Sequence, residues 1–219
     1  MTTRDNARVS VLLVDDHAVV REGYRRLLER ALEIAVVGEA ASAAEAYRLF
    51  TQLVPDVVVM DISLPDVSGI EAMRHLLLRE RLAKVLVFSI HEEAIFPDRA
   101  FRAGARGYIT KASAPEVLVE AVRAVARGDR FLSPDIAQRV AVRALAGASS
   151  TLKSLSDREF EIARLLARGR SVREIAKLLC LNHKTVANYQ WAIRNKLGAA
   201  TPIQLIQIAR QSGLIGDST

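Results

Sequence analysis

Residues 9–16 of the chain read VSVLLVDD, an apolar run that ends abruptly in two carboxylates. A second run, VVVM at residues 57–60, ends in Asp61. Short apolar runs rich in valine are typical of parallel strands that are buried on both faces. In open α/β sheets, the carboxyl ends of such strands line the crevice where ligands bind. We therefore expect Asp15, Asp16 and Asp61 to meet at one edge of a parallel sheet.

These three carboxylates predict a metal site. Carboxylates held close together repel one another unless a cation joins them. A set of oxygen ligands suits a hard divalent cation, and the expected cofactor is Mg²⁺. For a single aspartate at a strand end, a solvated turn residue is the more common interpretation. Three aspartates at two strand ends favour the metal site.

The composition limits the class of protein. The chain has 219 residues, which corresponds to one or two domains. Its single cysteine, Cys180, excludes an intramolecular disulfide and a zinc site built from several cysteines. We interpret Cys180 as a small buried apolar residue at a turn. Residues 1–6 are polar, and no apolar run approaches the ~20 residues that span a bilayer. These features predict a cytoplasmic protein that does not associate with membranes.

The net charge of +6 is unevenly distributed. Residues 1–149 contain 20 Lys/Arg and 20 Asp/Glu, whereas residues 150–219 contain 11 Lys/Arg and 5 Asp/Glu. The asymmetry indicates a neutral domain followed by one that binds an anionic partner. A basic surface without a partner is the alternative that charge alone leaves open.

Residues 8–128 alternate short apolar runs with amphipathic segments. The predicted strands are Val9–Val14, Ile34–Gly38, Val57–Met60, Val85–Ser89 and Gly107–Ile109. The predicted helices lie near 18–31, 43–53, 69–80, 95–103 and 114–127. Strict βα alternation implies a parallel sheet with right-handed crossovers. Five strands and five helices fit a flavodoxin-like, doubly wound α/β domain.

Different patterns follow this domain. Residues 129–151 are predicted to be a linker, with a helix that starts at Ser133-Pro134-Asp135 and runs to about residue 146, and with a small, polar end at 147–151. Residues 152–215 lack a strand signal and predict a small all-α domain with helices at 157–168, 172–179, 183–197 and 202–212. The capping-box spacing S-x-x-E, which predicts helix starts, begins at Ser42, Ser68, Ser113, Ser156 and Ser171.

On these residues, segment 8–128 resembles a response-regulator receiver domain. The resemblance assigns Asp15 and Asp16 to the acidic pair, Asp61 to the phosphoacceptor, Ser89 and Tyr108 to the switch, and Lys111 to the family's lysine. It implies that Asp61 is the nucleophile toward a phosphoryl group, with Lys111 and Ser89 completing the catalytic set.

The resemblance also implies how the metal is held and how the switch works. Mg²⁺ would be bound by Asp15, Asp16, Asp61 and the backbone carbonyl of Ser63. After phosphorylation, Ser89 would move toward the phosphate and Tyr108 would turn inward.

Residues 155–198 resemble a LuxR-type helix-turn-helix domain. Together the two segments resemble the NarL/FixJ family of two-component response regulators, and Phe96-Pro97 and Leu179-Cys180-Leu181 resemble its GacA/UvrY branch. The implied function is transcription regulation, with phosphorylation of Asp61 by a histidine kinase controlling homodimerisation and sequence-specific binding to double-stranded DNA. RNA polymerase is a further candidate partner.

Helix 183–197 is expected to enter the major groove. Val186, Ile193 and Leu197 recur at helical spacing and should face the domain core. Seven residues are the candidate DNA contacts: Lys184, Thr185, Ala187, Asn188, Trp191, Arg194 and Lys196. For Trp191, partial burial against a neighbouring helix is the alternative. The apolar last helix is the expected dimer contact, which predicts an inverted-repeat operator.

The sequence also bears on three other functions. Aspartate-nucleophile phosphatases need a second acid two residues beyond the nucleophile, but Ser63 occupies that position, so we do not expect an enzyme. A regulator that works without phosphorylation, or a receiver that acts mainly as a protein-interaction module, is the alternative to phosphorylation control. RNA binding by the tail is disfavoured because it lacks the interleaved aromatic residues of single-strand readers.

Overall fold

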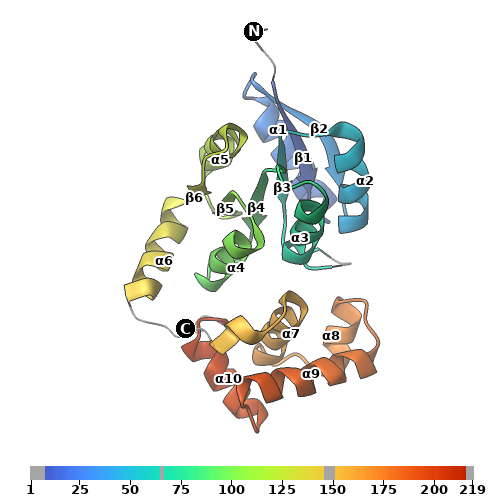
Figure 1. The fold of residues 1–219 in the computed structure, drawn as a ribbon, viewed down its shortest axis with the longest axis vertical. Coiled ribbons are helices and arrows are strands. Elements are labelled where there is room, and N and C mark those ends of the chain that lie inside the picture. Colours follow the sequence, from blue (N-terminus) through green and yellow to red (C-terminus); the bar gives the residue numbers. More distant parts are fainter. Residues whose placement is uncertain (1–7, 65–66, 146–150, 216–219) are drawn as a thin grey trace.

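The computed structural model describes residues 8–64, 67–145 and 151–215 (Figure 1). The part before residue 146 forms an α/β body, and the part after residue 150 forms a helical body. In the α/β body all strands are parallel, in the order β2-β1-β3-β4-β5-β6. The strands are β1 Val9–Val14, β2 Ile34–Ala40, β3 Val57–Met60, β4 Val85–Ser89, β5 Gly107–Thr110 and β6 Phe131–Leu132.

The predicted doubly wound parallel sheet is confirmed, but the number of strands was wrong by one. β6 pairs with β5 through Phe131 beside Gly107 and Leu132 beside Tyr108. It consists of two residues, which is too short for any hydrophobic periodicity to appear in the sequence. β6 is therefore explained by its pairing with the edge strand β5 and not by a pattern in its own sequence.

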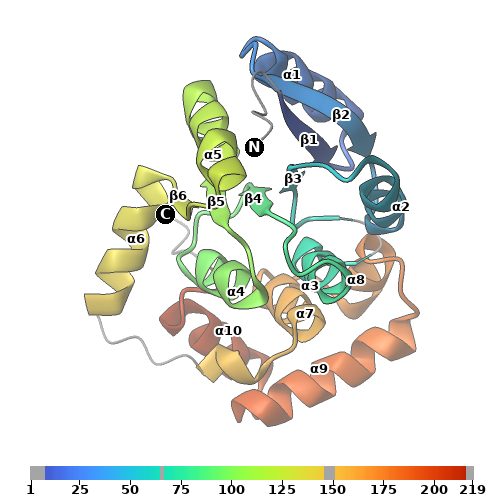
Figure 2. The same cartoon turned by 45° about the horizontal axis from the view of Figure 1, so that its top comes forward.

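Helices cover both faces of the sheet (Figures 1 and 2). One buried cluster joins the sheet to α1 and α5, and another joins it to α2, α3 and α4. α6 follows β6 and begins at Pro134, as predicted. The helices of this body are α1 Ala18–Glu29, α2 Ala43–Leu53, α3 Gly69–Arg79, α4 Ile95–Ala103, α5 Pro115–Arg127 and α6 Pro134–Leu145.

Two of the five predicted capping boxes form completely. The hydroxyl and backbone N–H of Ser156 and of Ser171 each exchange hydrogen bonds with the glutamate three residues later. Ser42 forms half of a box, because its hydroxyl accepts the N–H of Glu45 while the Glu45 carboxylate accepts the N–H of Ala41.

The helix start predicted at Ser68 is confirmed, because Ser68 is the N-cap of α3, although its side chain forms no capping bond. The prediction at Ser113 was wrong by one residue. The N-cap of α5 is Ala114, and the Ser113 hydroxyl instead lies 3.0 Å from the Thr110 hydroxyl. Pro115 opens α5 without a capping side chain because its fixed φ suits the first turn and it lacks an N–H that needs a partner.

The helical body contains the four predicted helices after a short 3₁₀ turn. The elements are η1 Thr151–Ser154, α7 Asp157–Ala167, α8 Val172–Leu178, α9 His183–Leu197 and α10 Pro202–Gln211. Val186, Ile193 and Leu197 are buried in its core, which confirms the predicted inner face of α9. Cys180 was expected to be buried, but it is exposed at a left-handed turn with φ 50°.

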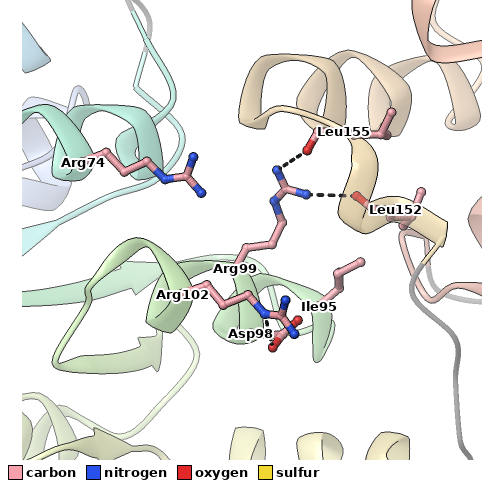
Figure 3. A pocket seen from close by; sticks show the side chains of 7 residues that line it. All are labelled: Arg74, Ile95, Asp98, Arg99, Arg102, Leu152 and Leu155. Atoms are coloured by element: carbon pink, nitrogen blue, oxygen red, sulfur yellow. Dashed lines mark hydrogen bonds and ion pairs between the residues drawn. The ribbon is translucent and has the colours of Figure 1, made fainter. Parts of the chain in front are cut away.

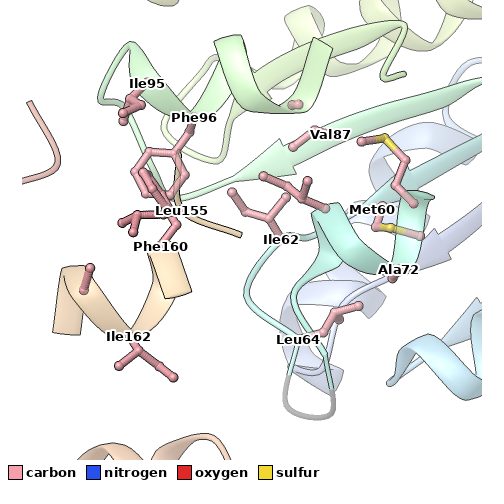
Figure 4. Close-up of a cluster of buried hydrophobic side chains, with 14 of the residues drawn as sticks. Met60, Ile62, Leu64, Ala72, Val87, Ile95, Phe96, Leu155, Phe160 and Ile162 are labelled. Atoms are coloured by element: carbon pink, nitrogen blue, oxygen red, sulfur yellow. The ribbon is translucent and has the colours of Figure 1, made fainter. Parts of the chain in front are cut away.

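The two bodies are in contact. α7 and η1 lie against α3 and α4, and one buried cluster continues from the α/β body into the helical body (Figure 4). The predicted small, polar end of the linker, 147–151, lies almost entirely outside the described residues. None of the helices in the described part of the chain has the length and apolar character needed to cross a membrane.

Candidate functional site

An acidic pocket lies at the carboxyl edge of the sheet. Asp15 follows β1 and Asp61 follows β3, and both are almost fully buried, with 2% and 3% of their surface exposed. Lys111, directly after β5, reaches between them. Its Nζ lies 2.6 Å from Asp15 Oδ2 and 2.6 Å from Asp61 Oδ2. Three residues that the sequence placed in one site therefore meet in space.

Burial and charge set the protonation of this pocket. Burial raises the pKa of Asp61, and the ammonium group of Lys111 opposes that rise. Burial alone would lower the pKa of Lys111, but Asp61 and Asp15 outweigh it and the pKa is raised. Lys111 therefore carries its positive charge at neutral pH and serves as counter-ion to the two carboxylates.

Asp16 and His17 form the rim of the pocket. Asp16 Oδ1 is buried without a hydrogen bond, although His17 Nδ1 lies only 2.8 Å away. Asp15, Asp16 and His17 each offer one ligand atom, and these atoms lie within 4.8 Å of one another. The sequence analysis included both aspartates in the metal site but missed His17. Asp61 is not part of this close group, and its carboxylate is joined to that of Asp15 through Lys111.

The expected switch residues, Ser89 and Tyr108, converge on the backbone of His91. The N–H of His91 donates to Ser89 Oγ at 3.1 Å, and the Tyr108 hydroxyl donates to the carbonyl of His91 at 2.7 Å. Tyr108 is fully buried, and burial raises its pKa. The sequence analysis expected Tyr108 to turn inward only after phosphorylation, whereas in this structure it already occupies the inward position.

The loop after Asp61 is held by backbone contacts. The N–H of Ser63 donates to Asp61 Oδ1 at 3.0 Å, and the N–H of Gly69 donates to the carbonyl of Ile62 at 3.1 Å. A Cβ on Gly69 would lie 2.1 Å from the carbonyl oxygen of Asp61. Gly69 is thus a functional position that the sequence analysis missed, because the Ser68–Glu71 spacing was interpreted as a capping box alone.

A second candidate site is the outer face of α9. Lys184, Ala187, Asn188 and Trp191 are exposed, and Thr185 is half-buried. Trp191 keeps 70% of its surface exposed, so the alternative of partial burial against a neighbouring helix was wrong. Figures 1 and 2 show α9 on the side of the helical body that is remote from the sheet, and the α/β body leaves this face open.

The two basic residues near the end of α9 have protein partners. Lys196 Nζ lies 2.7 Å from the Glu159 carboxylate. The Arg194 guanidinium donates to the carbonyls of Ala199 and Ala200, just beyond the helix. Both residues are among the seven candidate DNA contacts, and in this structure they bond to other parts of the helical body.

Comparison with known proteins identifies both bodies. Residues 11–123 match the model of the response regulator receiver domain, and residues 153–209 match that of bacterial regulatory proteins of the luxR family. Response regulator GacA of Pseudomonas aeruginosa is 39% identical over 209 residues, covering 94% of this chain and 98% of that protein. Response regulator UvrY of Escherichia coli K12 is 37% identical over 213 residues, covering 96% and 98%. The chain belongs to the LuxR-type response regulators.

A solved structure of two RcsB dimers bound to two parallel DNAs also resembles this response regulator. It is 25% identical, with a TM-score of 0.59, and the match covers 92% of this chain and 97% of that one. The predicted NarL/FixJ-type pairing of a receiver domain with a LuxR-type DNA-binding domain is therefore confirmed. The response regulator is a transcription regulator of a two-component system.

The acidic pocket of the response regulator fits a hard divalent cation. Asp16 Oδ1 forms no hydrogen bond and has His17 Nδ1 2.8 Å away, so it is an oxygen with unused ligand capacity beside the buried carboxylate of Asp15. Lys111 supplies one positive charge to two buried carboxylates, so the pocket still attracts a cation. Oxygen donors at this spacing are the ligands that Mg²⁺ accepts.

Proposed function

We propose that a sensor histidine kinase phosphorylates this response regulator on Asp61 and that the phosphoryl group controls dimerisation and DNA binding. The observation that carries the proposal is the position of the Asp61 carboxylate, which is buried at a strand end and bonded to Lys111 at 2.6 Å. A carboxylate held in this way is an oriented nucleophile. The receiver fold and the match to GacA and UvrY support the same assignment.

Asp61 and Lys111 have separate roles in the transfer. A carboxylate oxygen of Asp61 attacks the phosphorus atom of the kinase phosphohistidine. The P–O bond forms while the P–N bond breaks, and the histidine nitrogen keeps the electron pair. Lys111 orients Asp61 before the transfer and neutralises charge on the phosphoryl oxygens during it.

Asp15, Asp16, Asp61 and the carbonyl of Ser63 are proposed to hold Mg²⁺. When bound, the ion supplies Lewis-acid stabilisation of the negative charge that develops in phosphoryl transfer. Ser89 contributes a hydroxyl group. It accepts the N–H of His91 in this structure, and it is proposed to donate to a phosphoryl oxygen once Asp61 is modified.

In the DNA-binding domain, α9 is proposed to lie in the major groove. The exposed side chains of Asn188 and Trp191 reach base edges, whereas Lys184 and Thr185, in the first turn, contact phosphates. α10 carries Ile203, an isoleucine with 68% of its surface exposed, as the contact for a second protomer. A symmetric dimer requires an inverted repeat with half-sites about one helical turn apart.

The test measures operator affinity with and without a phosphoryl mimic. An operator is first selected from a random duplex library with protein treated with beryllofluoride and Mg²⁺. Wild type should bind it more tightly with the mimic, and Asp61→Asn should show no change. Asp129→Asn is the matched control, because it removes one exposed acid far from the pocket and should respond like wild type.

Two results would contradict the proposal. If Asp61→Asn still responded to beryllofluoride, Asp61 would not be the phosphoacceptor. If wild type bound beryllofluoride but its operator affinity stayed the same, the response regulator would act independently of phosphorylation.

A further inference from the structure

We propose that His91 is the residue through which the phosphoacceptor pocket positions the DNA-binding domain. Its backbone is held by the two switch side chains, and its ring contacts the phenylalanine pair that joins the two domains. This inference rests on the proposed phosphorylation of Asp61 and adds the route by which that event reaches α7. Each step of the route is a contact between described residues.

The backbone of His91 is fixed at both polar groups. Its N–H donates to Ser89 Oγ, and its carbonyl accepts from the Tyr108 hydroxyl. The ring Nε2 lies 3.3 Å from the hydroxyl of Ser63, two residues after the phosphoacceptor. Any movement of Ser89 toward a phosphoryl group on Asp61 removes the hydrogen-bond acceptor of this buried N–H, and the loop between β4 and α4 must then rearrange.

The ring of His91 faces the DNA-binding domain. It stacks on Phe96 of α4, with ring centroids 4.2 Å apart and an angle of 14° between the planes. Phe96 in turn meets Phe160 of α7 edge to face, at 5.3 Å and 81°. Figure 4 shows Phe96 and Phe160 side by side where α4 approaches α7. His91 is 4% exposed, so a shift of its ring must displace Phe96.

An ion pair holds the same two helices together. Arg99, one turn along α4 from Phe96, lies 2.7 Å from Asp157 at the start of α7. Its guanidinium also donates to the carbonyls of Leu152 and Leu155 in the segment before α7, as Figure 3 shows. Arg74 of α3 approaches the other Asp157 oxygen at 3.2 Å. These contacts hold α7 against α4. The stacking of His91 on Phe96 fixes the position of the Phe96 ring on α4.

The ring is neutral in this position. The pKa of His91 is lowered to about 3, mainly by burial and also by the positive charges of Arg164 on α7, Arg168 just beyond α7 and Lys111 after β5. Glu93 on the same loop is paired with Arg168 at 3.4 Å. The uncharged ring is therefore free to pack against Phe96 beside these cations.

The proposal can be tested in the full chain with two spin labels. Cys180 is the single native cysteine and is exposed in the DNA-binding domain. Leu78→Cys adds a second site on α3, at a side chain with 78% of its surface exposed. Pulsed electron resonance then measures the distance between domains, and ¹⁹F resonance measures beryllofluoride bound at Asp61. The two readouts separate phosphoryl-mimic binding from domain positioning.

Wild type should give a narrow distance distribution that is lost on adding beryllofluoride and Mg²⁺. His91→Ala should still bind beryllofluoride, but its distribution should be broad before the addition and unchanged by it. His91→Phe should restore both the narrow distribution and the response, because a phenyl ring can stack on Phe96. Ile90→Ala, which alters the exposed neighbouring side chain, is the matched control and should behave as wild type.

Three outcomes would overturn the inference. The first is a His91→Ala variant whose distance distribution is narrow before the addition of beryllofluoride and is lost after it, as in wild type. The second is wild type that binds beryllofluoride without any change in distance. The third concerns Phe160→Leu, which disrupts the contact from the other domain and covers the case in which His91→Ala fails to fold. A narrow distribution in that variant would also overturn it. Absence of bound beryllofluoride in wild type would instead contradict the proposed function.

Discussion

The carbonyl oxygen of Asp61 faces the α-carbon of Gly69 so closely that a methyl group there would lie 2.1 Å from it. The first residue of α3 thus packs directly on the backbone of Asp61. Ile62 Cα would lie 2.6 Å from the same methyl group. Because both neighbours are backbone atoms, a side chain on residue 69 forces the loop after β3 to move.

Gly69→Ala should therefore impair beryllofluoride binding without unfolding the receiver domain. The displaced loop should carry Asp61 away from Lys111. For phosphoryl transfer, a misplacement of the reacting groups by about 1 Å lowers the rate on the order of 100-fold. Bound beryllofluoride, measured by ¹⁹F resonance, reports the loss. Gly23→Ala is the control, because its methyl group meets nothing within 4 Å and should stabilise α1 by about 0.5–1 kcal/mol.

Arg99→Ala should destabilise the protein far more than Arg102→Ala. Both arginines are on α4 and line the same cavity, but Arg99 is paired across the domain boundary and Arg102 only with Asp98 on its own helix. Loss of the buried partner should lower the free energy of unfolding by about 3 kcal/mol. Arg102→Ala should change it by less than about 0.5 kcal/mol. If calorimetric melting showed equal destabilisation by Arg99→Ala and Arg102→Ala, the Arg99–Asp157 ion pair would not be what holds α7 on α4.

Lys111→Met should raise the affinity for Mg²⁺ and lower the affinity for beryllofluoride. Removing the ammonium group leaves Asp15 and Asp61 without their counter-ion, so Mg²⁺ should bind about tenfold more tightly, equivalent to about 1.4 kcal/mol. Beryllofluoride binding should fall, because its charge loses a partner. Titration calorimetry and ¹⁹F resonance measure the two quantities. Lys84→Met, at the opposite end of β4, should alter neither; weaker Mg²⁺ binding in Lys111→Met would contradict this electrostatic account.

Acid should destabilise the protein through His91. The folded-state pKa is about 3, below the unfolded value, so the unfolded state takes up a proton first as the pH falls. Stability is unaffected above about pH 6.5 and decreases by about 1.4 kcal/mol per pH unit from there toward pH 3. Urea unfolding at several pH values should show this slope in wild type and a shallower one in His91→Phe. Parallel slopes would exclude a neutral buried ring.

Asn188→Ala should weaken operator binding by about 1–3 kcal/mol and relax base preference at one position. Its side chain is exposed and makes no capping or core contact in the described structure, so thermal stability should stay the same. Asn195→Ala, an exposed asparagine in the last turn of the same helix, should bind as wild type. Competition assays with single-base operator variants distinguish the two; a uniform loss over all variants would assign Asn188 to phosphate contact.

Most of the receiver domain could be predicted from the sequence, because a buried parallel strand needs an unbroken apolar run. The carboxylates at the strand ends then fall at one edge, which is how Asp15 and Asp61 were placed together. β6 escaped detection because two residues carry no periodicity. Ser113 was misassigned because the S-x-x-E spacing also occurs where Pro115, one residue further on, begins the helix without a capping side chain.

Contacts between the domains could not be predicted. Arg99 and Asp157 are separated by 58 residues in the chain, and no local pattern relates them. The same holds for the bonds of Arg194 to the carbonyls of Ala199 and Ala200, which no sequence pattern indicates. His17 was also missed as a neighbour of the pocket, because a single histidine carries no spacing signal.

The open outer face of α9 has a consequence for how the regulator searches a genome. Docking on the receiver leaves Trp191 and Asn188 uncovered, so, if α9 binds DNA as proposed, we expect an unmodified protomer to bind isolated half-sites. We then expect the signal to act on the association of two protomers rather than on the exposure of α9, so that promoters would be distinguished by the strength of the dimer.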